Sequence, residues 1–162
     1  MRNNRRGFTL AEMIVTLGIM SLLTLSALPL AKMAVKRERE IDLQRSLRLM
    51  REAIDSYKKL ADEKNITVEE DTEGYPPDLQ TLVAGVISRD PQNAAGGKAR
   101  ATEKLVRFLR RIPMDPMTRS YDWGLRSYQD DLDSDTWGGE NVYDVYTKSR
   151  AVALDGTRYR DW

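Results

Sequence analysis

The residues of this chain that could do chemistry are its carboxylates, because its 162 residues include neither Cys nor His. This absence excludes disulfide scaffolds, zinc ribbons, thiol enzymes, Ser-His-Asp catalysis and His metal sites. One group of acids forms a D-x-D-x-D pattern of Asp131, Asp133 and Asp135, with Asp130 just before it. Hard oxygen ligands of this kind suit calcium. Asp131, Asp133 and Asp135 are therefore the candidate metal ligands, with calcium as the candidate cofactor.

Two other interpretations of this acidic run stay open. Asp130 and Asp131 could act as a carboxylate pair in acid–base catalysis, but no nucleophile or metal constellation accompanies them. The spacing also lacks the Gly and the terminal Glu of an EF-hand loop, so a solvated acidic loop is the alternative to a calcium site. The chain has no Gly-rich phosphate loop. We therefore expect no enzymatic activity and no nucleotide hydrolysis.

One further carboxylate, Glu12, lies inside an apolar segment. Phe8 to Ala31 reads FTLAEMIVTLGIMSLLTLSALPLA, and Glu12 is the one charged residue in it. A carboxylate at the centre of a membrane helix costs on the order of 2.5–3.5 kcal/mol, so such a residue usually has a partner or a function. The alternative is that Glu12 lies shallow enough to reach lipid headgroups and water.

The element that must position Glu12 is a long apolar helix. Its 24 residues span roughly 36 Å, which is enough to cross a hydrocarbon core of about 30 Å. Arg2, Arg5 and Arg6 precede it, and the positive-inside rule favours a cytoplasmic N-terminus. A secretory signal peptide is disfavoured, because the apolar core is too long and no convincing small-x-small cleavage site follows it. A plain membrane anchor remains the simpler alternative.

Pro29 lies late in this apolar segment. It lacks the N–H that would bond the carbonyl of Leu25, so we expect the helix to be kinked or locally opened there. A simple membrane proline is the alternative. Gly18 is a second weak point, and local melting between Gly18 and Pro29 during assembly is a hypothesis.

The run from Arg6 to Glu12, RGFTLAE, followed by the apolar helix, resembles the class III signal of type IV pilins and pseudopilins. The resemblance implies cleavage by a prepilin peptidase between Gly7 and Phe8, followed by methylation of the new Phe8 amine. Residues 1–7 would be the leader, 8–35 the transmembrane and filament-core helix, and 36–162 a periplasmic globular domain.

The same resemblance gives Glu12 a role in assembly. In a filament, Glu12 of one subunit can face the Phe8 amine of a neighbour and set the axial position of the incoming subunit. A buried ion pair of this kind contributes little to stability but is a good device for register. Pro29 also matches, because pilin-like proteins have a proline in this part of the helix, and some melt around it on assembly.

The apolar helix continues as an amphipathic helix. Apolar residues recur at spacings of 4, 3, 4, 3 and 4, which is one stripe of an α-helix. Since no Gly or Pro separates the two parts after Pro29, we expect one extended helix from about Phe8 to Asp62. The stripe consists of Leu43, Leu47, Met50, Ile54, Tyr57 and Ala61.

Beyond residue 62 the sequence predicts a small α+β body of the type IV pilin-like class. Pro77 and Asp78 suit the start of a short helix that ends at Gly85. The sequence then predicts a loop over 88–98 and a second amphipathic helix over 101–112. It predicts two antiparallel strands over 120–128 and 141–149. The last segment is a third strand or a packed tail, and we expect the sheet to cover the helical stripe.

The charge distribution gives no support to nucleic-acid binding. The chain has 26 basic and 25 acidic residues, and its net charge is +1. The expected helix 101–112 is basic on one side, but it has no interleaved aromatic residues of the type that stack on bases. A solvated face is the favoured interpretation, and contact with an acidic loop of a neighbouring subunit is a further hypothesis.

A second, narrower resemblance lies in the body. The body contains three short runs that resemble, in their order, the major pseudopilin of type II secretion systems, the G-type subunit. The runs are Gly74-Tyr75-Pro76, Ile112-Pro113-x-Asp115-Pro116 and Tyr143 to Thr147 (YDVYT). The terminal run from Ala153 to Trp162 is similar to terminal segments of a related branch. Major pseudopilins often bind calcium in the C-terminal loop, but their glycine-rich tail is replaced here by residues 150–154.

This resemblance implies a structural subunit of a type II secretion pseudopilus. The implied partners are copies of the chain in a helical filament, a prepilin peptidase, other pseudopilins and the inner-membrane assembly platform. The implied location is the bacterial inner membrane, with a single span and a periplasmic domain, and then the pseudopilus. A surface type IV pilin for adhesion, motility or DNA uptake is the alternative, although many such pilins contain a disulfide. A minor pseudopilin is a third possibility.

Overall fold

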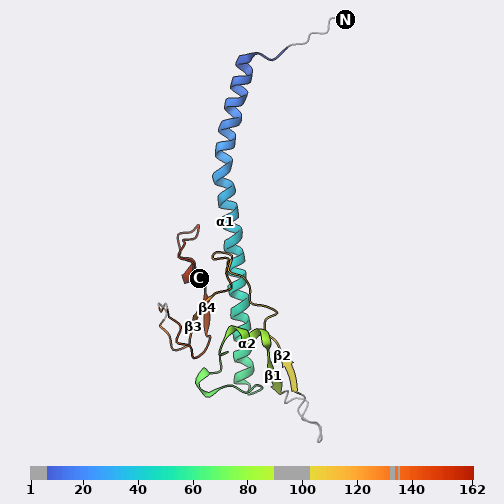
Figure 1. Ribbon diagram of the computed structural model, residues 1–162, viewed down its shortest axis with the longest axis vertical. Coiled ribbons are helices and arrows are strands. Elements are labelled where there is room, and N and C mark those ends of the chain that lie inside the picture. The colour runs from blue at the N-terminus through green and yellow to red at the C-terminus, as the bar shows by residue number, and fades with distance from the viewer. Residues whose placement is uncertain (1–6, 90–102, 132–133, 135) are drawn as a thin grey trace. The chain divides into compact units, whose positions relative to one another are not determined.

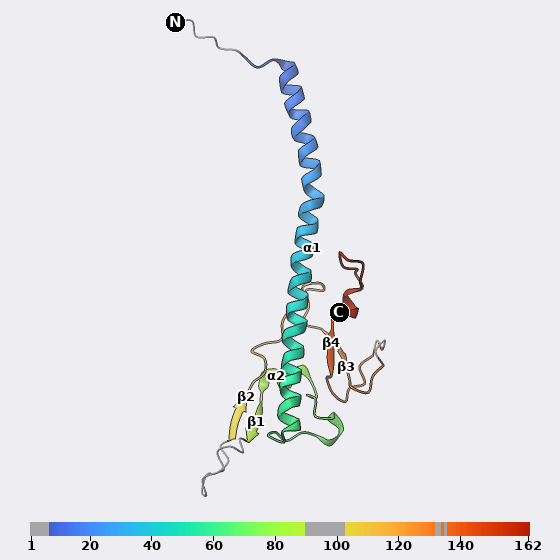
Figure 2. The ribbon, with the colours of Figure 1, turned by 180° about the vertical axis from the view of Figure 1, so that it is seen from behind.

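The computed structural model of the protein describes residues 7–89, 103–131, 134 and 136–162. The chain forms two compact units, Met1–Glu38 and Arg39–Trp162, which we call unit 1 and unit 2. In Figures 1 and 2 the described part of unit 1 is almost entirely helical, and the labelled strands all belong to unit 2.

Helix α1, Leu10–Asp62, confirms the predicted long N-terminal helix. It begins two residues after Phe8 because Thr9 caps it: the Thr9 hydroxyl accepts a hydrogen bond from the Glu12 N–H at 3.3 Å. Its residues 10–38 belong to unit 1 and its residues 39–62 to unit 2.

The part of α1 in unit 2 carries the core of that unit. All six residues of the predicted stripe are buried, and Leu43 and Met50 have no exposed surface. They form one apolar cluster with residues from every later part of the chain. The sequence predicted that the sheet covers this stripe, but of the later buried members of the cluster only Val145 lies in a strand, so α2, the loops and the tail supply most of the cover. The later members of the cluster are Ile66, Leu79, Leu82, Leu109, Trp123, Val142, Val145, Ala153 and Tyr159.

The predicted short helix is present as α2, Leu79–Ala84. The Asp78 carboxylate caps it by accepting hydrogen bonds from the Thr81 N–H at 2.6 Å and the Thr81 hydroxyl at 2.8 Å. Gly85 ends it with a positive φ of 85°, and a Cβ there would lie 2.5 Å from the Val106 carbonyl oxygen. This turn therefore needs glycine.

The predicted helix over 101–112 is wrong for its described part. Residues Glu103–Val106 form strand β2, which pairs antiparallel with β1, Val86–Arg89. Residues 88 and 89, predicted as loop, therefore belong to a strand, and the rest of that loop lies outside the described residues. A short apolar run fits both periodicities, and here pairing with β1 decided the outcome. After β2 the chain turns, and Leu82 O accepts hydrogen bonds from the N–H groups of Phe108 and Leu109.

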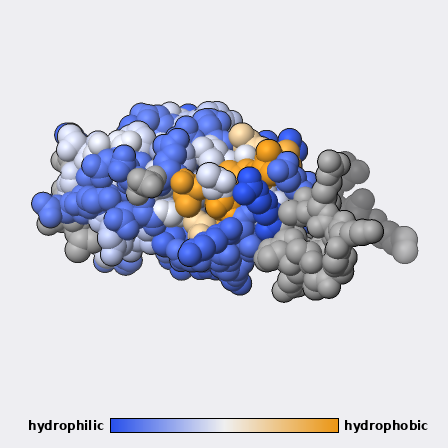
Figure 3. Space-filling model, turned by 90° about the horizontal axis from the view of Figure 1, so that it is seen from below, coloured by the Kyte–Doolittle hydropathy of each residue, from blue (hydrophilic) through white to orange (hydrophobic). Residues whose placement is uncertain are grey.

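The hairpin also exposes apolar surface. Ile87 and Leu105 pair across β1 and β2, so they share a face, and both are more than half exposed. In Figure 3 an apolar area is surrounded by hydrophilic residues on the side of the molecule seen there.

Two more strands confirm the predicted antiparallel pair, with shorter bounds. Strand β3, Gly124–Arg126, pairs with β4, Asp144–Tyr146. The Tyr146 ring covers Gly124, where a Cβ would lie within 2.3–2.7 Å of the ring carbons. The ring therefore excludes any larger residue at position 124.

The final segment is the packed tail, and it adds no strand to this sheet. It forms an isolated bridge between Val152 and Arg158 and then a 3-10 helix, η3, Tyr159–Asp161. Tyr159 is buried and packs edge-on against Trp162, with ring centroids 5.1 Å apart. Long helix, small antiparallel sheets and short helices together give the predicted α+β fold.

Candidate processing and assembly site

The predicted cleavage site lies immediately before α1. Gly7 is exposed, and a Cβ built on it would meet no atom within 4 Å. Phe8 is 74% exposed. The peptide bond between them therefore lies in an exposed, non-helical stretch of backbone that is accessible to a peptidase.

Glu12 lies in the first turn of α1 and is exposed. Its backbone N–H donates to the Thr9 hydroxyl, and the Met13 N–H donates to the Thr9 carbonyl at 3.2 Å. A carboxylate in this turn is favoured by the partial positive charge of the helix N-terminus. Glu12 thus stabilises the start of the helix in the single chain, in addition to any contact it makes between chains.

The sequence contained the signal for this local role. Thr9-Leu10-Ala11-Glu12 matches the T-x-x-E pattern of a capping box, in which a hydroxyl residue caps the helix and Glu follows three residues later. Sequence reasoning assigned Glu12 to assembly and missed the part played by Thr9.

Three hydroxyl groups of the apolar helix are satisfied within the helix itself. Thr16 donates to the Met13 carbonyl at 2.9 Å, and Ser21 and Thr24 donate to the carbonyls four residues before them at 2.8 Å. A hydroxyl bonded in this way needs no water, so these residues tolerate an apolar environment.

The apolar side chains of the helix in unit 1 are exposed on all its sides. Fifteen large apolar side chains between Phe8 and Val35 are exposed, and α1 is long and apolar enough to cross a membrane. Burying one such side chain is worth about 1.5–3 kcal/mol. A helix that is apolar on all sides therefore requires lipid or other copies of itself around it.

Pro29 lies inside α1, and the helix continues through it. The residue still cannot donate a hydrogen bond to the Leu25 carbonyl. Gly18 is also helical, and a Cβ on it would meet no atom within 4 Å. Local melting between these two residues on assembly stays a prediction.

The described residues do not bring the predicted calcium ligands together. Asp131 is exposed, while Asp133 and Asp135 lie outside the described residues. Asp130 is occupied with closing the loop, since its carboxylate accepts from the Ser127 N–H at 2.7 Å and from the Gly138 N–H at 3.1 Å. These backbone hydrogen bonds, the one from Ser127 first, lower the pKa of Asp130.

Within the described part of the chain, no group of three or more acidic residues has an arrangement that could hold a metal ion. The described donors therefore do not fit a calcium site without the two acids that the structure leaves out.

The body motifs converge in space. Asp115 is fully buried, and its carboxylate accepts from the Thr147 hydroxyl at 2.5 Å, the Met117 N–H at 2.8 Å and the Thr118 hydroxyl at 2.9 Å. This joins the 112–116 motif to the 143–147 motif. The third motif is joined by the Val142 N–H, which donates to the Pro76 carbonyl at 2.8 Å. The three motifs thus have a structural function in unit 2.

The C-terminal tail is held on α1 by two charged residues of the helix. The buried Glu40 carboxylate accepts from the Tyr159 hydroxyl at 2.9 Å and the Leu154 N–H at 2.8 Å. Arg51 binds both Asp144 oxygens, at 2.7 and 3.2 Å, and the Trp162 carbonyl at 2.7 Å. Burial, together with the bond to Glu40, raises the pKa of Tyr159 to about 12.

Comparison with known proteins identifies the N-terminal segment. A family model of the prokaryotic N-terminal methylation motif matches residues 2–28, which include Gly7, Phe8 and Glu12. No curated protein and no solved structure matches the chain significantly. The motif implies processing by a prepilin peptidase and assembly into a filament, and the exposed apolar helix fits a membrane-anchored protein. The N-terminal segment therefore carries the signature of a type IV pilin-like precursor.

Proposed function

We propose that the protein is a structural subunit of a type II secretion pseudopilus. The observation that carries this proposal is the combination of the methylation motif with an apolar helix that is exposed along its whole described length. Such a helix can be stored in the inner membrane and then packed among its copies in a filament. Unit 2, which has its own apolar core, forms the periplasmic surface of that filament.

The choice of a pseudopilus over a surface pilus is supported by the body motifs. Their order along the chain resembles the G-type subunit, and the Asp115–Thr147 bond and the Val142–Pro76 bond give that order a physical reason. The absence of Cys points the same way, because many surface pilins close a C-terminal loop with a disulfide.

Assembly follows from the chemistry of the first turn. Cleavage between Gly7 and Phe8 creates a cationic amine two residues before the start of α1, and methylation keeps its charge. Glu12 offers the opposite charge. In an apolar filament core an unpaired carboxylate is costly, so an incoming subunit is most stable where a Phe8 amine meets Glu12 of a neighbour.

The processing step is tested by the mass and N-terminal sequence of protein purified from the membrane. We expect a chain that begins at N-methylated Phe8 when a prepilin peptidase is co-expressed, and the unprocessed chain without it. A chain that begins well beyond Ala31 would contradict the proposal, because the helix would have been discarded.

The role of Glu12 is tested by Glu12→Leu, with Thr16→Val as a matched change in the same helix. We expect Glu12→Leu to insert in the membrane normally and to form few filaments, while Thr16→Val assembles like the unmodified chain. Normal filament yield from Glu12→Leu would contradict the pairing role.

The pseudopilus is distinguished from a pilus by deletion of the gene in its host. Loss of protein export across the outer membrane, with surface pili retained, supports the pseudopilus. The reverse result supports the surface pilin.

A calcium ion held by Asp131, Asp133 and Asp135 stays a prediction from the sequence. The melting temperature of unit 2 in excess calcium, compared with chelator, tests it. A rise that Asp131→Asn abolishes supports the site, and an unchanged melting temperature rejects it.

A further inference from the structure

A positively charged pocket lies beside strand β4, and the methylation motif gives it no role. Its volume is about 240 Å³. We call it the cationic pocket. It is lined by Tyr146, Thr147, Lys148, Arg150 and Arg160.

The cations around this pocket are only partly neutralised. Lys148 pairs with Asp122 at 2.6 Å, but both side chains are about half exposed or more, so water screens this pair. Arg150 is exposed and forms no ion pair with any residue that the structure describes. Arg126, whose side chain is only 16% exposed, lies over the Tyr146 ring at 4.6 Å and pairs with Asp144 at 3.9 Å, so its charge is partly neutralised and Arg150 is the cation that stays available.

Unit 2 also presents a surface of opposite charge. Residues 69–73 read EEDTE, with four acids and no base. We call them the acidic segment. The side chains of Glu69, Asp71 and Glu73 are exposed, and within the described residues none of the three forms an ion pair. The nearby Lys58 is bound to Asp62 at 2.6 Å instead.

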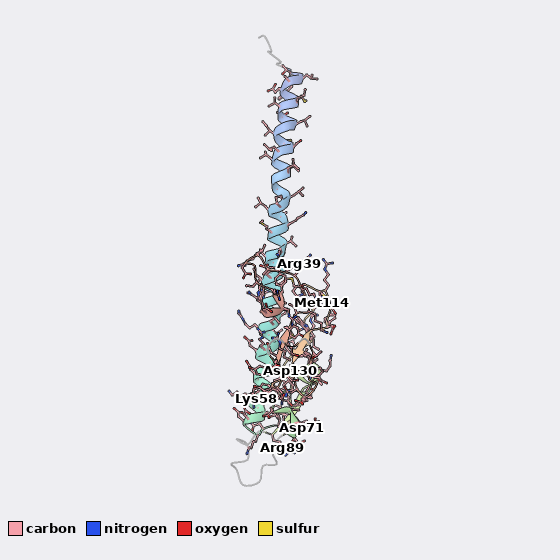
Figure 4. All side chains as sticks on the ribbon, turned by 90° about the vertical axis from the view of Figure 1, so that its left-hand side faces the viewer. Arg39, Lys58, Asp71, Arg89, Met114 and Asp130 are labelled. Atoms are coloured by element: carbon pink, nitrogen blue, oxygen red, sulfur yellow. The ribbon has the colours of Figure 1, made fainter. Side chains whose placement is uncertain are left out.

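The cationic pocket and the acidic segment lie beside different parts of α1 in unit 2: residues next to the pocket are bonded to Glu40 and Arg51, whereas the acidic segment is close to Lys58. Tyr159, which precedes Arg160, binds Glu40 on α1, while the ring of Tyr75, just after the acidic segment, lies 5.3 Å from the Lys58 ammonium. Lys58 is eighteen residues from Glu40 and seven from Arg51, which is roughly 27 and 10 Å along a helix. In Figure 4 Asp71 lies close to Lys58 and far from Arg39.

We propose that the cationic pocket of one copy binds the acidic segment of a second copy. This inference rests on the proposed filament, in which copies of unit 2 are neighbours. An open filament needs two different, complementary surfaces on each subunit, because a head-to-tail contact does not close on itself. Arginine clusters recognise acidic segments through charge-assisted hydrogen bonds. The two surfaces are separated along the axis of α1, as a head-to-tail contact requires.

Charge reversal tests the contact in filaments of the full-length chain. We expect Arg150→Glu or Asp71→Lys alone to reduce the yield of sedimentable filaments about tenfold. The chain with both changes restores opposite charges and should recover most of the yield. Arg45→Glu is the matched control, since Arg45 is 76% exposed on α1 and belongs to neither surface. Single variants that assemble normally, or a double variant no better than either single one, would overturn the proposal.

A second measurement does not depend on filament formation. The chain has no Cys, so a single introduced thiol reports its own neighbours. Full-length Ser149→Cys, beside the pocket, and Thr67→Cys, beside the acidic segment, are mixed in detergent and oxidised. We expect a mixed disulfide dimer, and much less of it with Ser56→Cys in place of Thr67→Cys or in 1 M salt.

The two experiments separate two kinds of failure. Mixed cross-links without filaments support the contact and contradict the proposed function. Filaments without mixed cross-links above the Ser56→Cys control contradict the contact and leave the proposed function intact.

Discussion

Two leucines of helix α1 show how differently its halves are stabilised. Leu22 in unit 1 is 69% exposed, whereas Leu43 in unit 2 has no exposed surface. Both belong to one helix with the same backbone hydrogen bonding. The second half is stabilised by the body that the same chain folds around it. The first half has no such cover, so only other molecules can bury it.

The sharpest test of this comparison makes the same substitution in both halves. We expect Leu43→Ala to lower the free energy of unfolding of unit 2 by about 2–5 kcal/mol, because it leaves a cavity in a buried core. We expect Leu22→Ala to change it by less than about 0.5 kcal/mol. The measurement is urea unfolding in detergent micelles followed by Trp fluorescence, since all three Trp residues lie in unit 2. Equal changes in the free energy of unfolding for Leu43→Ala and Leu22→Ala would contradict the difference between the two halves of α1.

The next effect concerns the buried carboxylate that joins two body motifs. Asp115→Ala leaves the Thr147 hydroxyl and the Met117 N–H without their acceptor, so we expect a loss of about 2–3 kcal/mol in the free energy of unfolding. Thr147→Val should cost less, because Asp115 keeps its other donors. A double-mutant cycle of the two measures their coupling, and additive effects would show that the bond contributes nothing specific.

A smaller effect appears at alkaline pH. The pKa of Tyr159 is about 12 in the folded protein and near 10 when the chain is unfolded, so the unfolded state releases its proton first. The stabilisation is complete below pH 10 and is lost as the pH rises towards 12. We expect Tyr159→Phe to reduce this loss and the exposed Tyr121→Phe to leave it unchanged, as measured by urea unfolding at pH 9, 10 and 11. If the free energy of unfolding of both variants depends on pH in the same way, Tyr159 is not the source of the loss at alkaline pH.

The smallest effect is expected in unit 1. The Thr24 hydroxyl donates to the Met20 carbonyl of its own helix, so Thr24→Val removes a bond that no other element depends on. Membrane insertion and the urea unfolding of unit 2 should both stay within about 0.5 kcal/mol of the unmodified chain. A marked loss of filaments from this variant would instead place Thr24 at a contact between chains.

Long periodic signals in the sequence predicted the fold best. The stripe from Leu43 to Ala61 predicted both the second half of α1 and its buried side, because a pattern sustained over five turns has one interpretation. Asp78 and Gly85 predicted the ends of α2 through the hydrogen bond and the positive φ that such residues favour. The helix predicted over 101–112 was wrong, since its apolar run was short and the residues of β1 that pair with β2 lie 14 to 20 positions away along the chain.

The residues of the candidate site likewise include some that the sequence predicted and some that only the structure revealed. Gly7, Phe8 and Glu12 form a local pattern, and the family model covers all three. The partnership of Asp115 with Thr147 and of Glu40 with Tyr159 could not be read from the sequence, because each joins residues at least 32 positions apart. Nothing in the local spacing of those residues specifies such a bond. The structure was needed to show that an acid among the charged residues 36–40 is a buried anchor for the tail.

The bond between Glu40 and Tyr159 can form only near the end of biosynthesis. Synthesis at about 5–20 residues per second means that their separation of 119 positions corresponds to roughly 6–24 s. During that interval Glu40 has been made and its partner, Tyr159, has not. Unit 2 can close over the beginning of its helix only after the last stretch of the chain is made, so until then the nascent protein depends on whatever shields Leu43 and its neighbours from aggregation.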